Sequence, residues 1–123
     1  MTTQDEQDVR AVIAGYFDAL YHGDVEGFRR VLHPQVRLFS AADGTMTNLD
    51  LETYMGMVAS RPSSASRNDP RADEIVAVTV SSPTTAHARL RDVYLPKRFT
   101  NEITFIKIDG RWQIIAKVWH FVL

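Results

Sequence analysis

Apolar residues recur at helical spacing through the first third of the chain. Between Asp5 and Tyr21 they fall three and four positions apart, which predicts an amphipathic helix. His22-Gly23 fits the end of this helix, because glycine readily adopts the left-handed conformation that stops a helix. Asp24 then fits the N-cap of a second, shorter helix, which we expect to end at His33-Pro34. The pattern therefore predicts two consecutive helices.

A short hairpin and a third helix are expected next. Residues from Val36 to Ser40 alternate as in a strand, and Ala42-Asp43-Gly44 turns the chain into a second short strand over 45–48. Asp50 fits the N-cap of a helix with one apolar face, formed by Leu51, Tyr54, Met55 and Val58. The polar segment 61–72 is long for a loop in a compact domain, so it is either mobile or a lid over a site.

Alternation with a period of two dominates the second half, which predicts antiparallel strands over 75–81, 85–95 and 99–120. Asp109-Gly110 divides the last segment into a long hairpin, because a two-residue type I′ turn needs positive φ at both central positions. The order of elements is two helices, a small hairpin, a third helix and a four-stranded meander. It indicates an α+β fold, with helices on one face of a curved antiparallel or mixed sheet.

The turn also predicts the register of the long hairpin. If the turn holds only two residues, Glu102 lies opposite Lys117, and this pairing of opposite charges favours the register. One face then carries Asn101, Ile103, Phe105, Trp112, Ile114, Ala116, Val118 and His120. The other face carries Thr100, Glu102, Thr104, Ile106, Gln113, Ile115, Lys117, Trp119 and Phe121. Two apolar faces that differ this much indicate two different neighbours.

The composition indicates a small cytoplasmic protein with a single domain over residues 1–123. Apolar residues make up 45% of the chain and charged residues 24%, which is ordinary for a globular protein. The net charge is −1 and no cluster of basic residues is present, so the sequence does not indicate nucleic-acid binding. The absence of cysteine excludes disulfides and thiol nucleophiles. The acidic N-terminal segment is the reverse of a signal peptide, and no apolar run is long enough to span a membrane.

Three segments resemble the NTF2-like (SnoaL-like) superfamily. They are Tyr16-Phe17-Asp18-Ala19-Leu20-Tyr21-His22-Gly23-Asp24 with Phe28 and His33-Pro34, the strand Val36-Arg37-Leu38-Phe39, and the segment from Phe99 to Ile114. They are most similar to the lumazine-binding subgroup, and the match spans nearly the whole chain except the 61–72 loop. The resemblance implies a cystatin-like α+β cone with a pocket between sheet and helices. It says little about function, because this fold carries isomerases, dehydratases, cyclases and non-catalytic binders.

The resemblance also implies which side of the hairpin is concave. In the superfamily, the tryptophan after the last turn is similar to a core residue packed under the helices, so the Trp112 face is expected to be the inner one. A small-molecule pocket needs apolar walls with a few converging polar groups. The residues expected to line it are Tyr16, Tyr54, Met55, Val58, Asp92, Tyr94, Phe99, Asn101 and His120.

Three of these residues are candidates for catalysis. Asp92 and His120 could form an acid–base pair, in which the carboxylate holds the imidazole tautomer. The alternative is a partly exposed histidine near the C-terminus and a hydrogen-bonded aspartate. Tyr16 resembles the first-helix tyrosine of ketosteroid isomerases, which donates to a developing oxyanion; the alternative is a core tyrosine with a satisfied hydroxyl. The general base of those enzymes corresponds to a position close to Ser40, and a serine cannot abstract a carbon-bound proton.

The opposite face of the hairpin is too apolar to stay in water as a contiguous patch. We expect it to form a homodimer interface through Ile115, Trp119 and Phe121. The alternative is that residues 119–123 fold over their own sheet edge. The four histidines have no metal-binding spacing and no glycine-rich phosphate loop is present, so no metal and no cofactor are expected.

Three functions remain open from the sequence. The first is a dimeric protein that binds a small apolar or aromatic ligand in a conical pocket. The second is a cofactor-independent acid–base enzyme, a dehydratase, isomerase or cyclase, acting on a small apolar substrate. The third is a structural or protein-interaction domain that works through the Trp119 face. The sequence leaves open whether the protein is an enzyme.

Overall fold

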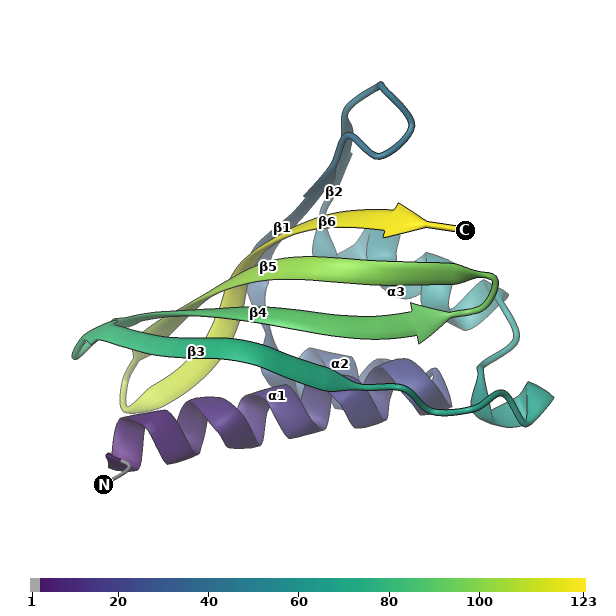
Figure 1. Cartoon of the computed structure of the whole chain (residues 1–123). Helices are drawn as coiled ribbons and strands as arrows, with labels where there is room; N and C mark the ends of the chain where they lie inside the picture. Colours follow the sequence, from purple (N-terminus) through teal and green to yellow (C-terminus); the bar gives the residue numbers. More distant parts are fainter. Residues whose placement is uncertain (1–2) are drawn as a thin grey trace.

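Helices lie against the concave face of a single curved sheet (Figure 1). The computed structural model describes residues 3–123. Its elements are α1 (Gln4–His22), α2 (Val25–Val31), β1 (Leu32–Ser40), β2 (Thr47–Leu49), α3 (Leu51–Ser60), the 3-10 helix η1 (Ala65–Arg67), β3 (Glu74–Ser82), β4 (Thr85–Tyr94), β5 (Lys97–Ile108) and β6 (Arg111–Val122). The α+β fold class, with three helices from the first half of the chain packed on the sheet, is confirmed.

The helices begin and end where local chemistry favours it. The Asp24 carboxylate accepts a hydrogen bond from the Gly27 backbone N–H at 3.0 Å and caps α2. Asp50 accepts one from the Thr53 backbone N–H at 2.8 Å and caps α3. Gly23 ends α1 at a φ of +62°, a conformation that is strained for residues with a Cβ atom. These caps match the sequence prediction.

The sheet is mixed, with the strand order β2-β1-β6-β5-β4-β3. Strand β1 runs parallel to β6, and the other neighbours are antiparallel. Strand β1 starts at Leu32, directly after α2, so His33-Pro34 lies inside the strand and not at a helix end as expected. Pro34 is tolerated there because the β1–β6 pairing is interrupted between Leu32 and Arg37.

One inserted residue changes the register of the hairpin between β5 and β6. Close to the Asp109-Gly110 turn the pairs are as predicted, with Phe105 opposite Ile114. Ile115 then has no partner on β5, because Thr104 pairs with Ala116. This β-bulge shifts every later pair by one position, so the predicted pairs beyond it are wrong. Figure 1 shows β6 bending strongly along its length.

The bulge exchanges the two faces of the outer half of β6, because side chains alternate with a period of two. Lys117 is only 6% exposed and lies on the concave side, whereas Val118 is 49% exposed. Glu102, which was expected opposite Lys117, instead accepts a hydrogen bond from Arg89 at 2.8 Å, and its carboxylate lies 3.2 Å from Nε2 of His87. The bulge therefore moves a lysine into the interior of the fold.

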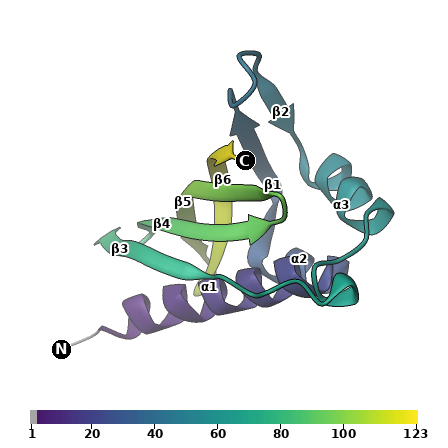
Figure 2. The ribbon, with the colours of Figure 1, turned by 45° about the vertical axis from the view of Figure 1, so that its right-hand side comes forward.

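Packing differs along the concave face. Helix α1 runs beneath the strands, and α3 lies to one side, near β1 and β2 (Figure 2). Near the hairpin turn, Phe105 and Ile114 are fully buried, and the Trp112 indole N–H donates to the Asp5 carboxylate at 3.1 Å. The Trp112 face is therefore concave, as predicted. No helix within residues 3–123 is long and apolar enough to cross a membrane.

Candidate ligand pocket around Lys117

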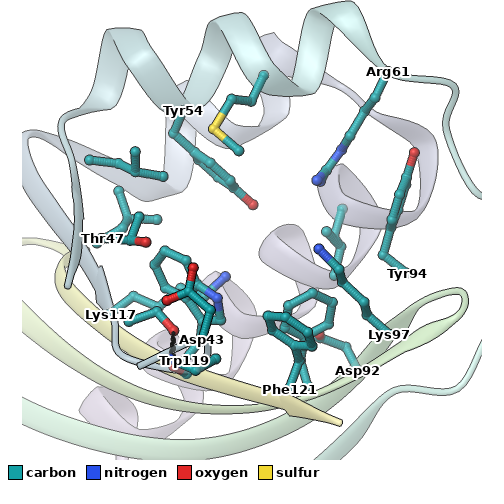
Figure 3. A pocket seen from close by; sticks show the side chains of 17 residues that line it. Asp43, Thr47, Tyr54, Arg61, Asp92, Tyr94, Lys97, Lys117, Trp119 and Phe121 are labelled. Atoms are coloured by element: carbon teal, nitrogen blue, oxygen red, sulfur yellow. Dashed lines mark hydrogen bonds between the residues drawn. The ribbon is translucent and has the colours of Figure 1, made fainter. Parts of the chain in front are cut away.

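A cavity of about 270 Å³ lies between α3 and the open end of the β5–β6 hairpin (Figure 3). Its apolar walls come mainly from aromatic side chains: Tyr54, Tyr94, Phe99, Trp119 and Phe121. Its charged lining groups are Asp43, Arg61, Asp92, Lys97 and Lys117. This combination of aromatic walls and a few charged groups is typical of sites for small molecules.

Lys117 is the buried cation of this pocket. Its Nζ donates a hydrogen bond to the Tyr16 hydroxyl at 2.5 Å, and Tyr16 is completely buried in α1. The same Nζ lies 5.2 Å from the centre of the Tyr16 ring and 5.6 Å from those of Tyr54 and Trp119. These distances are within the range of cation–π attraction, so three aromatic rings and one hydroxyl hold the amine in place.

Asp92 is the buried acid of the pocket, at 3% exposure on β4. The Asn101 side-chain amide donates to its carboxylate at 2.9 Å. Burial raises the pKa of Asp92, while the positive charge of Lys117 and the hydrogen bond from Asn101 lower it by less. Burial also raises the pKa of Tyr16, with a further contribution from the charge of Asp92. Tyr16 therefore keeps its proton over the whole physiological range.

The rim of the pocket is built around Tyr94. The guanidinium groups of Arg61 and Arg67 lie 4.2 and 4.5 Å from the centre of its ring. The Tyr94 hydroxyl donates to the Pro62 carbonyl at 2.6 Å, which fixes the 61–72 loop to the end of β4. In Figure 3 the Arg61 side chain reaches from the end of α3 toward the cavity, opposite Lys97. Positive charge therefore lies at the rim as well as at Lys117.

The structure brings together four of the nine residues expected in the pocket: Tyr54, Asp92, Tyr94 and Phe99. Four others are buried without lining the cavity: Tyr16, Met55, Val58 and Asn101. His120 is exposed and pairs with Thr100 on the convex face, so the expected Asp92–His120 pair does not exist. The bulge is the reason, because it turns the His120 side chain away from the helices.

The residues expected at a dimer interface also lie elsewhere. Trp119 and Phe121 line the cavity, so the prediction that they form an outward apolar face is wrong. Ile115 is the half-buried residue of the bulge itself. Formation of a homodimer stays a prediction, but Trp119 and Phe121 do not provide an outward surface for it.

Sequence reasoning missed Lys117 and Arg61 as pocket residues. Lys117 was assigned to the outer face by the unbroken register. A signal was present, since Ile114-Ile115-Ala116 interrupts the alternation of the strand just where the extra residue lies. Arg61 lies at the end of α3, where no pattern distinguishes a pocket residue from a solvated one. Within residues 3–123, no cluster of three or more His, Cys, Asp or Glu could hold a metal ion.

Solved structures share this architecture over the whole chain. An NTF2-like protein of unknown function from Shewanella baltica superimposes with a TM-score of 0.86 at 20% identity, covering 100% of this chain and 99% of that one. A ketosteroid isomerase-like protein from Erwinia carotovora gives a TM-score of 0.77 at 14% identity, covering 99% of both chains. At these identities the likeness establishes the fold alone.

Two sequence comparisons add to this. A curated protein named aldolase FrzH, from a Cladobotryum species, is 23% identical over 122 residues, which are 98% of this chain and 94% of that protein. The family model described as "Putative lumazine-binding" matches residues 4–120. The chain therefore belongs to this family of NTF2-like proteins.

Proposed function

We propose that the protein binds a small molecule with a flat, mainly apolar body and a carbonyl oxygen, which is held next to Lys117. The observation that carries this proposal is the Lys117 amine, buried beside a cavity with aromatic walls. A lysine ammonium has three donors, and Tyr16 accepts one of them. A carbonyl oxygen in the cavity supplies the acceptor that the remaining donors need.

Size and charge narrow the class of ligand. A volume of about 270 Å³ lies just below the range of ~300–1,000 Å³ that drug-sized ligands occupy, so a compact ligand fits best. The rings of Tyr54, Phe99 and Trp119 favour stacking with a planar body. Arg61 and Lys97 at the rim add positive charge, which favours neutral or anionic molecules over cations.

The family description supports the same chemistry. Lumazine is a flat bicyclic heteroaromatic compound with ring carbonyl groups, and so combines a stacking surface with hydrogen-bond acceptors. The family model covers every residue that lines the pocket except Phe121. We therefore choose lumazine as the first probe for this site.

Titration with lumazine, followed by calorimetry, tests the proposal. Lys117→Met removes the amine, and we expect it to weaken binding about ten- to hundredfold, as for the loss of a hydrogen bond to a charged group worth ~1.5–3 kcal/mol. Lys107→Met is the matched control, because Lys107 is bonded to Asp5, away from the cavity. Equal affinities for the two variants, or no binding by the wild-type protein, would contradict the proposal.

A second candidate is an acid–base enzyme that acts on the carbon next to the ligand carbonyl. Asp92 supports it, because burial raises the pKa of this carboxylate and makes it a stronger base. The aldolase name of the Cladobotryum relative supports the same type of chemistry. In deuterated water, a ketone bound by the wild-type protein should exchange its α-protons faster than one bound by Asp92→Asn. Identical exchange rates would reject Asp92 as the base.

A further inference from the structure

We propose that Lys117 forms a covalent imine with an aldehyde or ketone that enters the pocket. This inference rests on the proposed function, since it requires the ligand carbonyl to lie at the Lys117 amine. It goes beyond that function in two ways. Lys117 acts as a nucleophile and not only as a hydrogen-bond donor, and the class of ligands is restricted to aldehydes and ketones that react with amines. A lysine beside a cavity with aromatic walls has the surroundings in which such chemistry occurs.

The three lysines of the chain differ in ways that single out Lys117. Lys107 lies 2.9 Å from a carboxylate oxygen of Asp5, and this ion pair holds its ammonium. Lys97 is exposed at the rim, over the ring of Phe121. Lys117 is 6% exposed, and no carboxylate oxygen of residues 3–123 lies within 4.0 Å of its Nζ. Its amine is therefore oriented by neutral groups and is not locked in an ion pair.

The reaction needs no component beyond the amine and the carbonyl compound. The lone pair of the deprotonated Nζ attacks the carbonyl carbon, and the π electrons move to oxygen, which takes up a proton. The nitrogen releases a proton and the resulting carbinolamine loses its hydroxyl, protonated, as water. Overall, an ammonium and a carbonyl compound give an iminium ion and water. The positive charge stays on the nitrogen, so the electrostatics of the pocket are preserved.

Two neighbouring groups can assist these steps, one as a hydrogen-bond partner of the nitrogen and one as a proton carrier. The Tyr16 hydroxyl lies 2.5 Å from Nζ and stays protonated, so it can hydrogen-bond the nitrogen throughout. Asp92 lines the same cavity as the buried carboxylate but lies beyond 4.0 Å from Nζ, so it can accept a proton from the amine and return it to the departing hydroxyl through one bridging water. The rings of Tyr54 and Trp119 around Nζ limit access of water, which protects an imine from hydrolysis.

Reductive trapping tests the inference. The whole protein is incubated with benzaldehyde and cyanoborohydride, which reduces an iminium ion to a stable amine, and is then analysed by intact mass and peptide mapping. We expect one benzyl group, on Lys117. The matched variant is Lys117→Arg, which keeps a buried cation and a donor but forms no imine under these conditions. Lys107→Arg controls for reaction at the surface. Binding of benzaldehyde is measured in parallel by saturation-transfer NMR.

The outcomes separate the two proposals. A benzyl group on Lys117 that is retained in Lys107→Arg and lost in Lys117→Arg supports the imine. If only Lys97, Lys107 or the N-terminal amine carries a benzyl group, the imine at Lys117 is ruled out. This outcome is measured on the wild-type protein, so it holds even if Lys117→Arg fails to fold. Binding of benzaldehyde without any label on Lys117 overturns the imine and leaves the proposed function standing. Absence of binding by both benzaldehyde and lumazine overturns both.

Discussion

The two halves of the β5–β6 hairpin are packed differently although they belong to the same pair of strands. Next to the turn, Phe105 and Ile114 face each other in a close-packed interior. Beyond the bulge, Lys117 and Trp119 on β6 border the cavity. Their partners on β5, Ile103 and Asn101, stay fully buried. The boundary between the two halves is the single unpaired residue Ile115.

This difference shows how a continuous sheet can supply both a core and a site. Without the bulge, period-two alternation would place Val118 and His120 on the inner side and leave Lys117 in water. With it, an ionisable group reaches the interior on a rigid element. Sites built on strands are held more firmly than sites on loops. The bulge is therefore the feature that most needs testing.

Deletion of Ile115 and Ala116 together should have the largest effect. Removing Ile115 alone leaves Ala116 opposite Thr104 and Lys117 facing inward, because Ile115 is the unpaired residue. Removing both residues places Lys117 opposite Thr104 on the outer face and turns His120 toward the helices. We expect the double deletion to abolish lumazine binding and to lower the free energy of unfolding by a large share of the ~5–15 kcal/mol that is typical of ordinary domains. Urea denaturation and calorimetry measure the two effects. Ile115→Ala keeps the residue count and should keep the pocket, and loss of binding in this control would place the cause outside the register.

Truncation of one aromatic side chain in each half gives the next contrast. Phe105→Ala should lower the free energy of unfolding by about 3–5 kcal/mol, because Phe105 is fully buried and its removal leaves a void. Trp119→Ala should lower it by only about 1 kcal/mol, the average for point substitutions, because Trp119 already borders open space. Chemical denaturation measures both. Equal losses would show that the pocket half is as close-packed as the core half.

Replacement of Asp92 by asparagine should change stability least, and it should raise the stability where most substitutions lower it. Burial raises the pKa of Asp92, so the ionised form weakens the folded state at neutral pH. Asparagine keeps an oxygen for the Asn101 amide and removes the charge. We expect Asp92→Asn to melt at a higher temperature than wild type at pH 7. The difference should vanish below about pH 3.9, the unfolded carboxyl value, where both side chains are neutral.

A second aspartate at the same pocket provides the control for this prediction. The backbone N–H and hydroxyl of Thr45 hydrogen-bond the Asp43 carboxylate and lower its pKa, so ionisation favours the folded state. Asp43→Asn should therefore melt at a lower temperature than wild type at pH 7, again with no difference at low pH. A lower melting temperature for both variants at pH 7 would contradict the assignment of Asp92 as a buried, destabilising charge.

Most of the fold was predictable from the sequence because local signals and long-range packing agree. Asp24 and Asp50 cap helices, Gly23 ends one, and Asp109-Gly110 forms the last turn, each through chemistry confined to a few neighbouring residues. The concave side of the sheet was predicted from the family resemblance, which identified Trp112 as a residue packed under the helices, and the structure agrees.

The candidate site was predicted only in part, and the dividing line is again Ile115. Tyr54, Asp92 and Phe99 lie on elements whose periodicity is unbroken, and they line the cavity. Lys117 and Trp119 lie beyond the bulge, and one extra residue reverses the side to which every later residue points. The position of a bulge depends on how the whole sheet packs against its neighbours. The local sequence therefore indicates this position only weakly.

Tyr94 has a consequence for how molecules reach the site. Tyr94 lies at the end of β4, and its hydroxyl bonds the carbonyl of Pro62, 32 residues earlier in the chain. Its ring contacts Arg61 and Arg67, so Tyr94 holds the 61–72 loop against β4. Widening this entrance requires the loss of a hydrogen bond and two cation–π contacts at once. For ligands that enter past Tyr94, we therefore expect selection by molecular width before they reach Lys117. Association rates should fall off with molecular width more steeply than equilibrium affinities do.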